Sequence, residues 1–111
     1  MLNEKIAREQ IDELAKAMLT LKSVEEARGF FEDILTVGEV QVIAQRLAVA
    51  RMLRQGTTYQ EIAESTGAST ATISRVNRAL TYGAGGYLLV LERMEASAEA
   101  DKSEDQEEEK R

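Results

Sequence analysis

Apolar residues recur at intervals of three and four along most of this 111-residue chain, with charged and polar residues between them. This spacing gives an amphipathic helix one apolar stripe, whereas a half-buried strand alternates apolar and polar residues. Proline is absent, and residues that favour helix are plentiful. We find no credible segment with period two. The pattern predicts an all-α protein.

The predicted helices are separated by short polar or glycine-containing junctions. Helices are expected over about residues 3–21, 24–35, 37–55 and 87–98, with two shorter helices within 56–80. Three junctions place a glutamate three positions after a hydroxyl residue, which is the spacing of a capping box: Ser23 with Glu26, Thr36 with Glu39, and Thr58 with Glu61. In the third helix the main apolar stripe includes Ala50, and Val49 lies off that stripe.

The stretch from Gly56 to Leu80 predicts a helix-turn-helix motif over residues 58–80. Thr58 can cap its first helix, and Ser69 or Thr70 can cap its second. Gly67 stands where a tight turn between two helices needs a residue that tolerates positive φ. The expected inward positions have the spacing of such a motif: Tyr59, Ile62 and Ala63 on the first motif helix, and Ile73, Val76 and Leu80 on the second.

The outer face of the second motif helix has no acidic residue. It offers hydroxyls, an amide and two guanidinium groups, which suit phosphates and base edges. We expect DNA contacts from this face, from the start of the first motif helix and from an arginine just before it: Arg54, Thr58, Gln60, Ser69, Thr70, Ala71, Ser74, Arg75 and Arg78. The alternative is a protein-interaction adaptor that uses the same motif without reading DNA.

The charge of the chain is unevenly distributed. The net charge is −6, yet residues 41–82 carry five arginines and only two acids. Residues 1–40 and 95–111 are both strongly acidic. Exposed charges more than about 10 Å apart are largely screened at 0.1 M salt, so the local field decides DNA binding. The motif lies in the net-positive section, which favours double-stranded DNA as the partner.

Composition disfavours several other classes of function. The chain has no cysteine and no histidine, and no pair of acids stands out on an apolar background. We therefore expect no catalytic site, no metal site and no cofactor. No apolar run approaches the roughly 18 residues of a membrane span, and the N-terminus has no signal core. A cytoplasmic, bacterial protein without a membrane partner is expected.

Two regions are expected in the chain. Residues 1–94 carry the apolar pattern and form one helix-turn-helix domain. Residues 95–111 are rich in acids and contain no large apolar residue. Such a segment buries too little apolar surface to offset the entropy of ordering, so we expect an acidic, disordered tail.

The run EVQVIAQRLAVARMLRQGTTYQEIAESTGASTATISRVNRAL, residues 39–80, resembles the Trp repressor superfamily. Within it, QRLAVARMLRQG and GASTATISRV are most similar to the YerC/YecD branch. The resemblance covers roughly residues 9–94. It implies a six-helix fold, an intertwined homodimer, and a DNA-binding transcriptional regulator. That regulator would be a repressor reading a near-palindromic operator with two motifs about 34 Å apart.

The resemblance also implies a pocket for a small co-repressor. The arginines that hold tryptophan in Trp repressor match Arg46 and Arg75, and a threonine lining that pocket matches Thr72. The chain departs from the pattern at Val76, where Trp repressor has a glycine that leaves room for the indole ring, and at Ala79, where it has a serine. The departure disfavours tryptophan and leaves open whether any ligand is needed.

Overall fold

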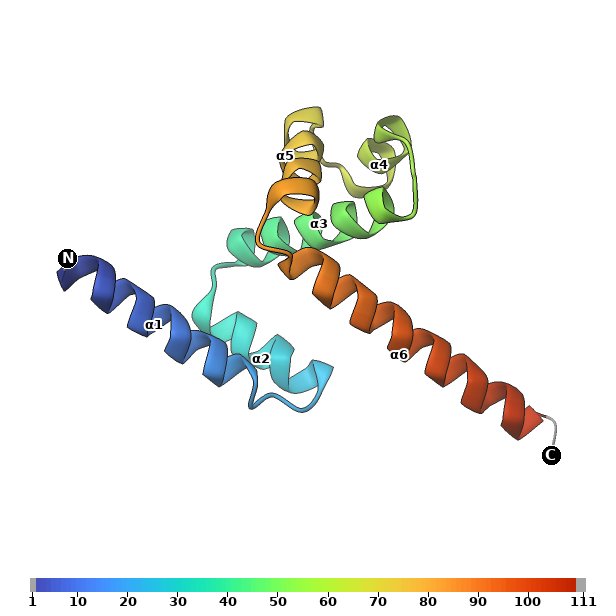
Figure 1. Ribbon diagram of the computed structural model, residues 1–111, viewed down its shortest axis with the longest axis horizontal. Coiled ribbons are helices and arrows are strands. Elements are labelled where there is room, and N and C mark those ends of the chain that lie inside the picture. Colours follow the sequence, from blue (N-terminus) through green and yellow to red (C-terminus); the bar gives the residue numbers. More distant parts are fainter. Residues whose placement is uncertain (1, 110–111) are drawn as a thin grey trace. The chain divides into compact units, whose positions relative to one another are not determined.

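The computed structural model describes the backbone of residues 2–109 and the side chains of residues 3–102. Within this range the chain forms helices and no strand, which confirms the all-α prediction (Figure 1). The elements are α1 (Leu2–Met18), α2 (Val24–Ile34), α3 (Val37–Arg54), α4 (Tyr59–Thr66), α5 (Thr70–Tyr82) and α6 (Gly86–Glu109). The chain divides into two compact units, up to Gln41 and from Val42 onward, and each is described separately.

The first unit contains α1, α2 and the start of α3. No side chain described in it is buried. Many of its apolar residues are exposed, with Ile11 at 63%, Val24 at 73% and Val37 at 76%, while Phe30 and Phe31 are half-buried. Burial of apolar surface is the main driving force for folding. These helices therefore lack a core of their own within one chain.

Capping boxes define the starts of α2 and α3. The Ser23 hydroxyl accepts the Glu26 N–H at 3.0 Å, and the Glu26 carboxylate accepts the Lys22 N–H at 2.9 Å. At α3 the exchange is reciprocal: Thr36 N–H donates to the Glu39 carboxylate at 2.9 Å, and Glu39 N–H donates to the Thr36 hydroxyl at 3.2 Å. The backbone N–H of Thr36, and then its side chain, lower the pKa of Glu39.

The second unit has a compact apolar core. Its fully or nearly fully buried side chains come from every helix of the unit and from the turn in the motif: Val49, Ala50, Ile62, Ala68, Ile73, Val76 and Leu91. The inward positions predicted at Ile62, Ile73 and Val76 are confirmed. Val49, which helical periodicity places off the main stripe, is fully buried. This core holds α4 and α5 against α3 and α6.

Helix α6 differs from the predicted pattern because it continues to Glu109, past the expected end near Ala98. Residues 95–109, predicted as disordered, are helical in the described backbone, and residues 110–111 lie outside it. No glycine, proline or β-branched residue interrupts this stretch, and its alanine, glutamate, glutamine and lysine residues propagate a helix well. None of the described helices is both long and apolar enough to cross a membrane.

Candidate DNA interface

The turn between α4 and α5 is built around Gly67. Its backbone is left-handed, with φ 73° and ψ 6°, and its N–H donates to the Ala63 carbonyl at 2.9 Å. Glycine reaches this conformation without the steric cost that a side chain adds. Thr66 braces the turn: its hydroxyl donates to the Ile62 carbonyl at 2.7 Å and accepts the Ala68 N–H at 3.2 Å. The segment thus forms the predicted helix-turn-helix.

Gln45 supports this turn from α3, outside the motif. Its Nε2 donates to the Thr66 carbonyl at 3.1 Å in a partly buried contact. The bond satisfies one of the carbonyls that the end of a helix leaves unpaired. Helical spacing does not reveal this contact, because the two residues lie 21 positions apart.

Both motif helices begin at predicted capping residues. The Thr58 hydroxyl accepts the Glu61 N–H at 3.3 Å, and the Ser69 hydroxyl accepts the Thr72 N–H at 3.1 Å. Ser69 also donates to the Thr72 hydroxyl at 3.1 Å. Each cap satisfies one of the amide donors that a helix start leaves unpaired. The other amides at these two helix starts can face an anion.

The outer face of α5 is exposed where the sequence predicts contacts. The buried stripe of this helix holds Ile73 and Val76. The exposed residues include all the predicted contacts on α5 and its cap: Ser69, Thr70, Ala71, Ser74, Arg75 and Arg78. Asn77 is also exposed, and no acidic residue lies on α5. This face therefore presents hydroxyls, an amide and two positive charges to solvent.

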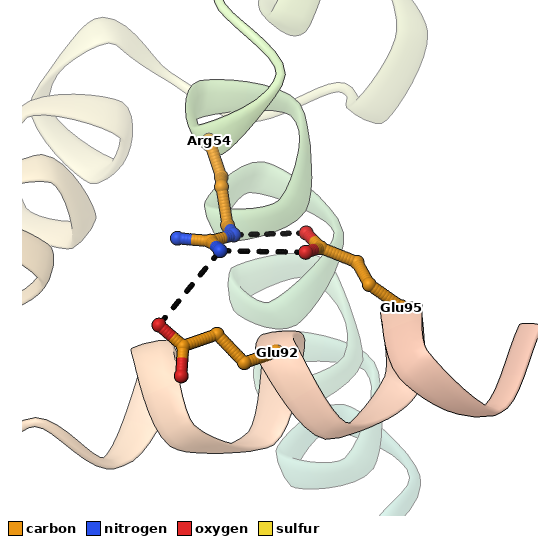
Figure 2. Close-up of polar contacts among 3 residues, drawn as sticks. All are labelled: Arg54, Glu92 and Glu95. Atoms are coloured by element: carbon orange, nitrogen blue, oxygen red, sulfur yellow. Dashed lines mark hydrogen bonds and ion pairs between the residues drawn. The ribbon is translucent and has the colours of Figure 1, made fainter. Parts of the chain in front are cut away.

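Arg54 is engaged in a contact that the sequence does not predict. Figure 2 shows its guanidinium facing two carboxylates on α6. Nε and Nη2 donate to the two oxygens of Glu95 at 2.8 and 3.3 Å, and Nη2 lies 3.8 Å from a Glu92 oxygen. The hydrogen bonds to Glu95, and then the charges of Glu95 and Glu92, raise the pKa of Arg54. Arg54 thus ties the end of α3 to α6.

Two further side-chain pairs lie on the exposed side of the motif. Gln60, a predicted phosphate contact, donates from Nε2 to Glu64 at 3.5 Å. Asn77 on α5 donates from Nδ2 to the Tyr59 hydroxyl on α4 at 3.2 Å. Apolar periodicity places Tyr59 with Ile62 on the inward face, but Tyr59 is 38% exposed. Its hydroxyl links the two motif helices at the surface.

The residues of the implied ligand pocket are exposed to different degrees. Arg46 and Thr72 are half-buried, and Arg75 is exposed. Among the described residues, no hydrogen bond or ion pair joins these three side chains. Val76 belongs to the core and is only 2% exposed. Its two methyl groups therefore fill space in the interior of the domain.

The comparisons with known proteins agree in both sequence and structure. The family model for the Trp repressor protein matches residues 9–95. The uncharacterized protein YerC of Bacillus subtilis (strain 168) is 50% identical over 91 residues, covering 82% of this chain and 88% of YerC.

Two crystal structures are also similar to this chain. A candidate Trp repressor from Staphylococcus aureus has a TM-score of 0.77 at 49% identity, covering 86% of this chain and 95% of that one. A TrpR-like protein from Eubacterium eligens ATCC 27750 has a TM-score of 0.76 at 52% identity, covering 82% of this chain and 94% of that one. The six-helix TrpR-like fold is thereby confirmed, and the chain belongs to the Trp repressor family.

Proposed function

We propose that this protein is a sequence-specific, DNA-binding transcriptional regulator that represses its target genes. Members of the Trp repressor family are regulators rather than enzymes, which supports this class of function. The observation that carries the proposal is the exposed, acid-free outer face of α5 on a complete helix-turn-helix. Such a face can enter the major groove without like-charge repulsion from phosphates.

The proposed contacts divide by type. Recognition helices read base edges mainly with their N-terminal residues, which here are Ser69, Thr70 and Ala71. Further along α5, Ser74 extends the same face. The guanidinium groups of Arg75 and Arg78 can pair with guanine or with phosphate.

The phosphate contacts flank that face. Thr58 and Gln60 stand at the start of α4, the helix that crosses the DNA backbone in such motifs. Arg54 is less available, since its Nε and Nη2 hold the Glu95 carboxylate. A phosphate that takes both of these donors would have to displace that carboxylate. Each phosphate neutralised by an arginine contributes about one unit to the salt dependence of binding.

We propose that the active form is a homodimer. The supporting observation is the first unit, in which no described side chain is buried and apolar residues of α1 and α2 face solvent. Exposed apolar surface of this kind marks an interaction site, and a second copy would supply the missing core. A two-fold dimer presents two motifs one helical turn apart and so reads a near-palindrome.

A tryptophan co-repressor is not part of the proposal. Val76 occupies the interior of the domain, and room for an indole ring next to Arg75 would require that core to open. Another small molecule held by Arg46, Thr72 and Arg75 is compatible with DNA binding but is not required by it. As a regulator of genes in a bacterial cell, the protein would act in the cytoplasm.

The decisive experiment is selection of bound fragments from sheared genomic DNA of the source organism. Purified protein is used at about 150 mM salt without added ligand. Enrichment of a near-palindrome with half-sites one turn apart is the expected result. Enrichment only after amino acids and nucleobases are added would indicate a required co-repressor. No enrichment in either case would refute DNA readout and favour the adaptor role.

A further inference from the structure

We infer that the Tyr59 hydroxyl donates a hydrogen bond to a DNA phosphate and that Asn77 positions it for this contact. The inference rests on the proposed DNA binding and assigns a contact that the motif pattern does not predict. It starts from the 3.2 Å hydrogen bond between Asn77 Nδ2 on α5 and Tyr59 Oη on α4. The two residues lie 18 positions apart, and both are exposed.

The direction of this hydrogen bond determines what the tyrosine can still do. A phenol has one O–H donor and can also accept. Because its oxygen accepts from Asn77, the O–H must point elsewhere, and no described residue accepts it. The group therefore presents a donor to solvent. Donation from Asn77 also polarises the O–H and strengthens its own donation, as in other hydrogen-bond chains.

A phosphate is the acceptor that best fits this position. Tyr59 is the first residue of α4, and the first helix of such a motif crosses the DNA backbone, not the base edges. Phosphate oxygens only accept hydrogen bonds, so they suit a hydroxyl whose O–H donor is still unused. The start of α4 also carries the positive end of the helix dipole, which favours an anion.

Asn77 acts in this arrangement through Tyr59. On α5 it is exposed and lies three residues after Ser74, so these two residues share a face of the helix, which is proposed to meet DNA. One of its amide N–H groups is already used by Tyr59. Its contribution to DNA affinity should therefore largely disappear once the tyrosine hydroxyl is removed.

The test measures dissociation constants on a duplex recovered by the fragment selection, for wild type, Tyr59→Phe, Asn77→Ala and the double variant. Tyr82→Phe is the matched control, because it makes the same chemical change at a side chain that is 83% exposed. We expect Tyr59→Phe to weaken binding about tenfold, the effect of losing a hydrogen bond to a charged group. The control should bind like wild type.

Three further readouts separate a phosphate contact from a structural effect. The salt slope of Tyr59→Phe should equal that of wild type, because a neutral hydroxyl releases no counterion. The loss should be the same on duplexes with altered bases. On duplexes with single methylphosphonates, one position should abolish the difference between Tyr59→Phe and wild type. Adding Asn77→Ala to Tyr59→Phe should cost little more.

The outcomes are distinguishable from failure of the proposed function. If wild type binds no duplex, the DNA-binding proposal itself fails. If wild type binds and Tyr59→Phe binds equally well, or if its loss depends on base identity or persists at every methylphosphonate, the phosphate contact is overturned. Fully additive losses in the double variant would overturn the positioning role of Asn77.

Discussion

The most direct test of the motif geometry is the replacement of Gly67 by alanine. The backbone there has φ 73° and ψ 6°, a region that costs an L-residue roughly 1–2 kcal/mol. A methyl group would meet only Gln45 Nε2, at 4.0 Å, which is an ordinary contact. The cost is therefore conformational rather than a collision. Alanine also has less conformational freedom than glycine in the unfolded chain, which stabilises the folded state by about 0.4–1 kcal/mol. We therefore expect the free energy of unfolding to fall by a net amount of about 1 kcal/mol.

Two matched variants isolate the cause. Gly67→Asn should lose less than Gly67→Ala, because asparagine tolerates the left-handed region. Gly29→Ala makes the same change within α2, where the added methyl group would have no neighbouring atom of another segment within 4 Å. The free energy of unfolding should rise by about 0.5–1 kcal/mol. The assay is urea unfolding at one fixed protein concentration, since assembly contributes to stability. Equal losses for alanine and asparagine at position 67, or a gain for Gly67→Ala, would refute the reasoning.

The remaining predictions concern charge and assembly. Glu95→Ala should remove the two hydrogen bonds that hold Arg54, increasing DNA affinity and steepening its salt dependence by up to about one unit; Glu99→Ala is the control, and an unchanged slope would show that Arg54 does not reach a phosphate. Thr36→Ala should raise the pKa of Glu39 only part of the way to its ordinary value, as followed by NMR titration, because it removes the hydroxyl and keeps the backbone N–H that is the larger cause. Because that pKa is depressed in the folded protein, the stabilisation by Glu39 is present above the unfolded pKa and lost as pH falls through the folded one; a wild-type carboxyl that titrates normally would contradict this. Sedimentation should show a dimer, and the midpoint of thermal unfolding should rise with protein concentration. A folded monomer at all concentrations would exclude the homodimer.

Local signals were the most predictable part of this fold. The caps at Ser23, Thr36 and Thr58 depend only on a hydroxyl and the amides two or three residues later, so their spacing suffices to find them. The stripe of α5 was equally clear because that helix packs on one side. Val49 shows the limit: a helix that contacts several neighbours buries more than one stripe, and periodicity alone does not say which.

The side-chain pairings of the site were not predictable in the same way. Arg54 and Glu95 lie 41 positions apart, and Tyr59 and Asn77 lie 18 apart. Their meeting depends on how helices cross, which a single sequence does not encode in its spacing. The exposed face of α5 could be predicted, because exposure follows from which residues are inward. It was not possible to predict whether the side chains on this face already have hydrogen-bond partners.

The apolar helices α1 and α2 and the recognition helix α5 fall in different units of the chain, and this separation has a genetic consequence. With the proposed homodimer, a chain whose α5 has lost its contacts would still pair with intact copies through the first unit. Each mixed dimer would hold one working motif and bind its site weakly. A defective allele should therefore act dominantly, because its product draws intact chains into mixed dimers that bind DNA weakly. Deleting the first unit from the same allele should make it recessive.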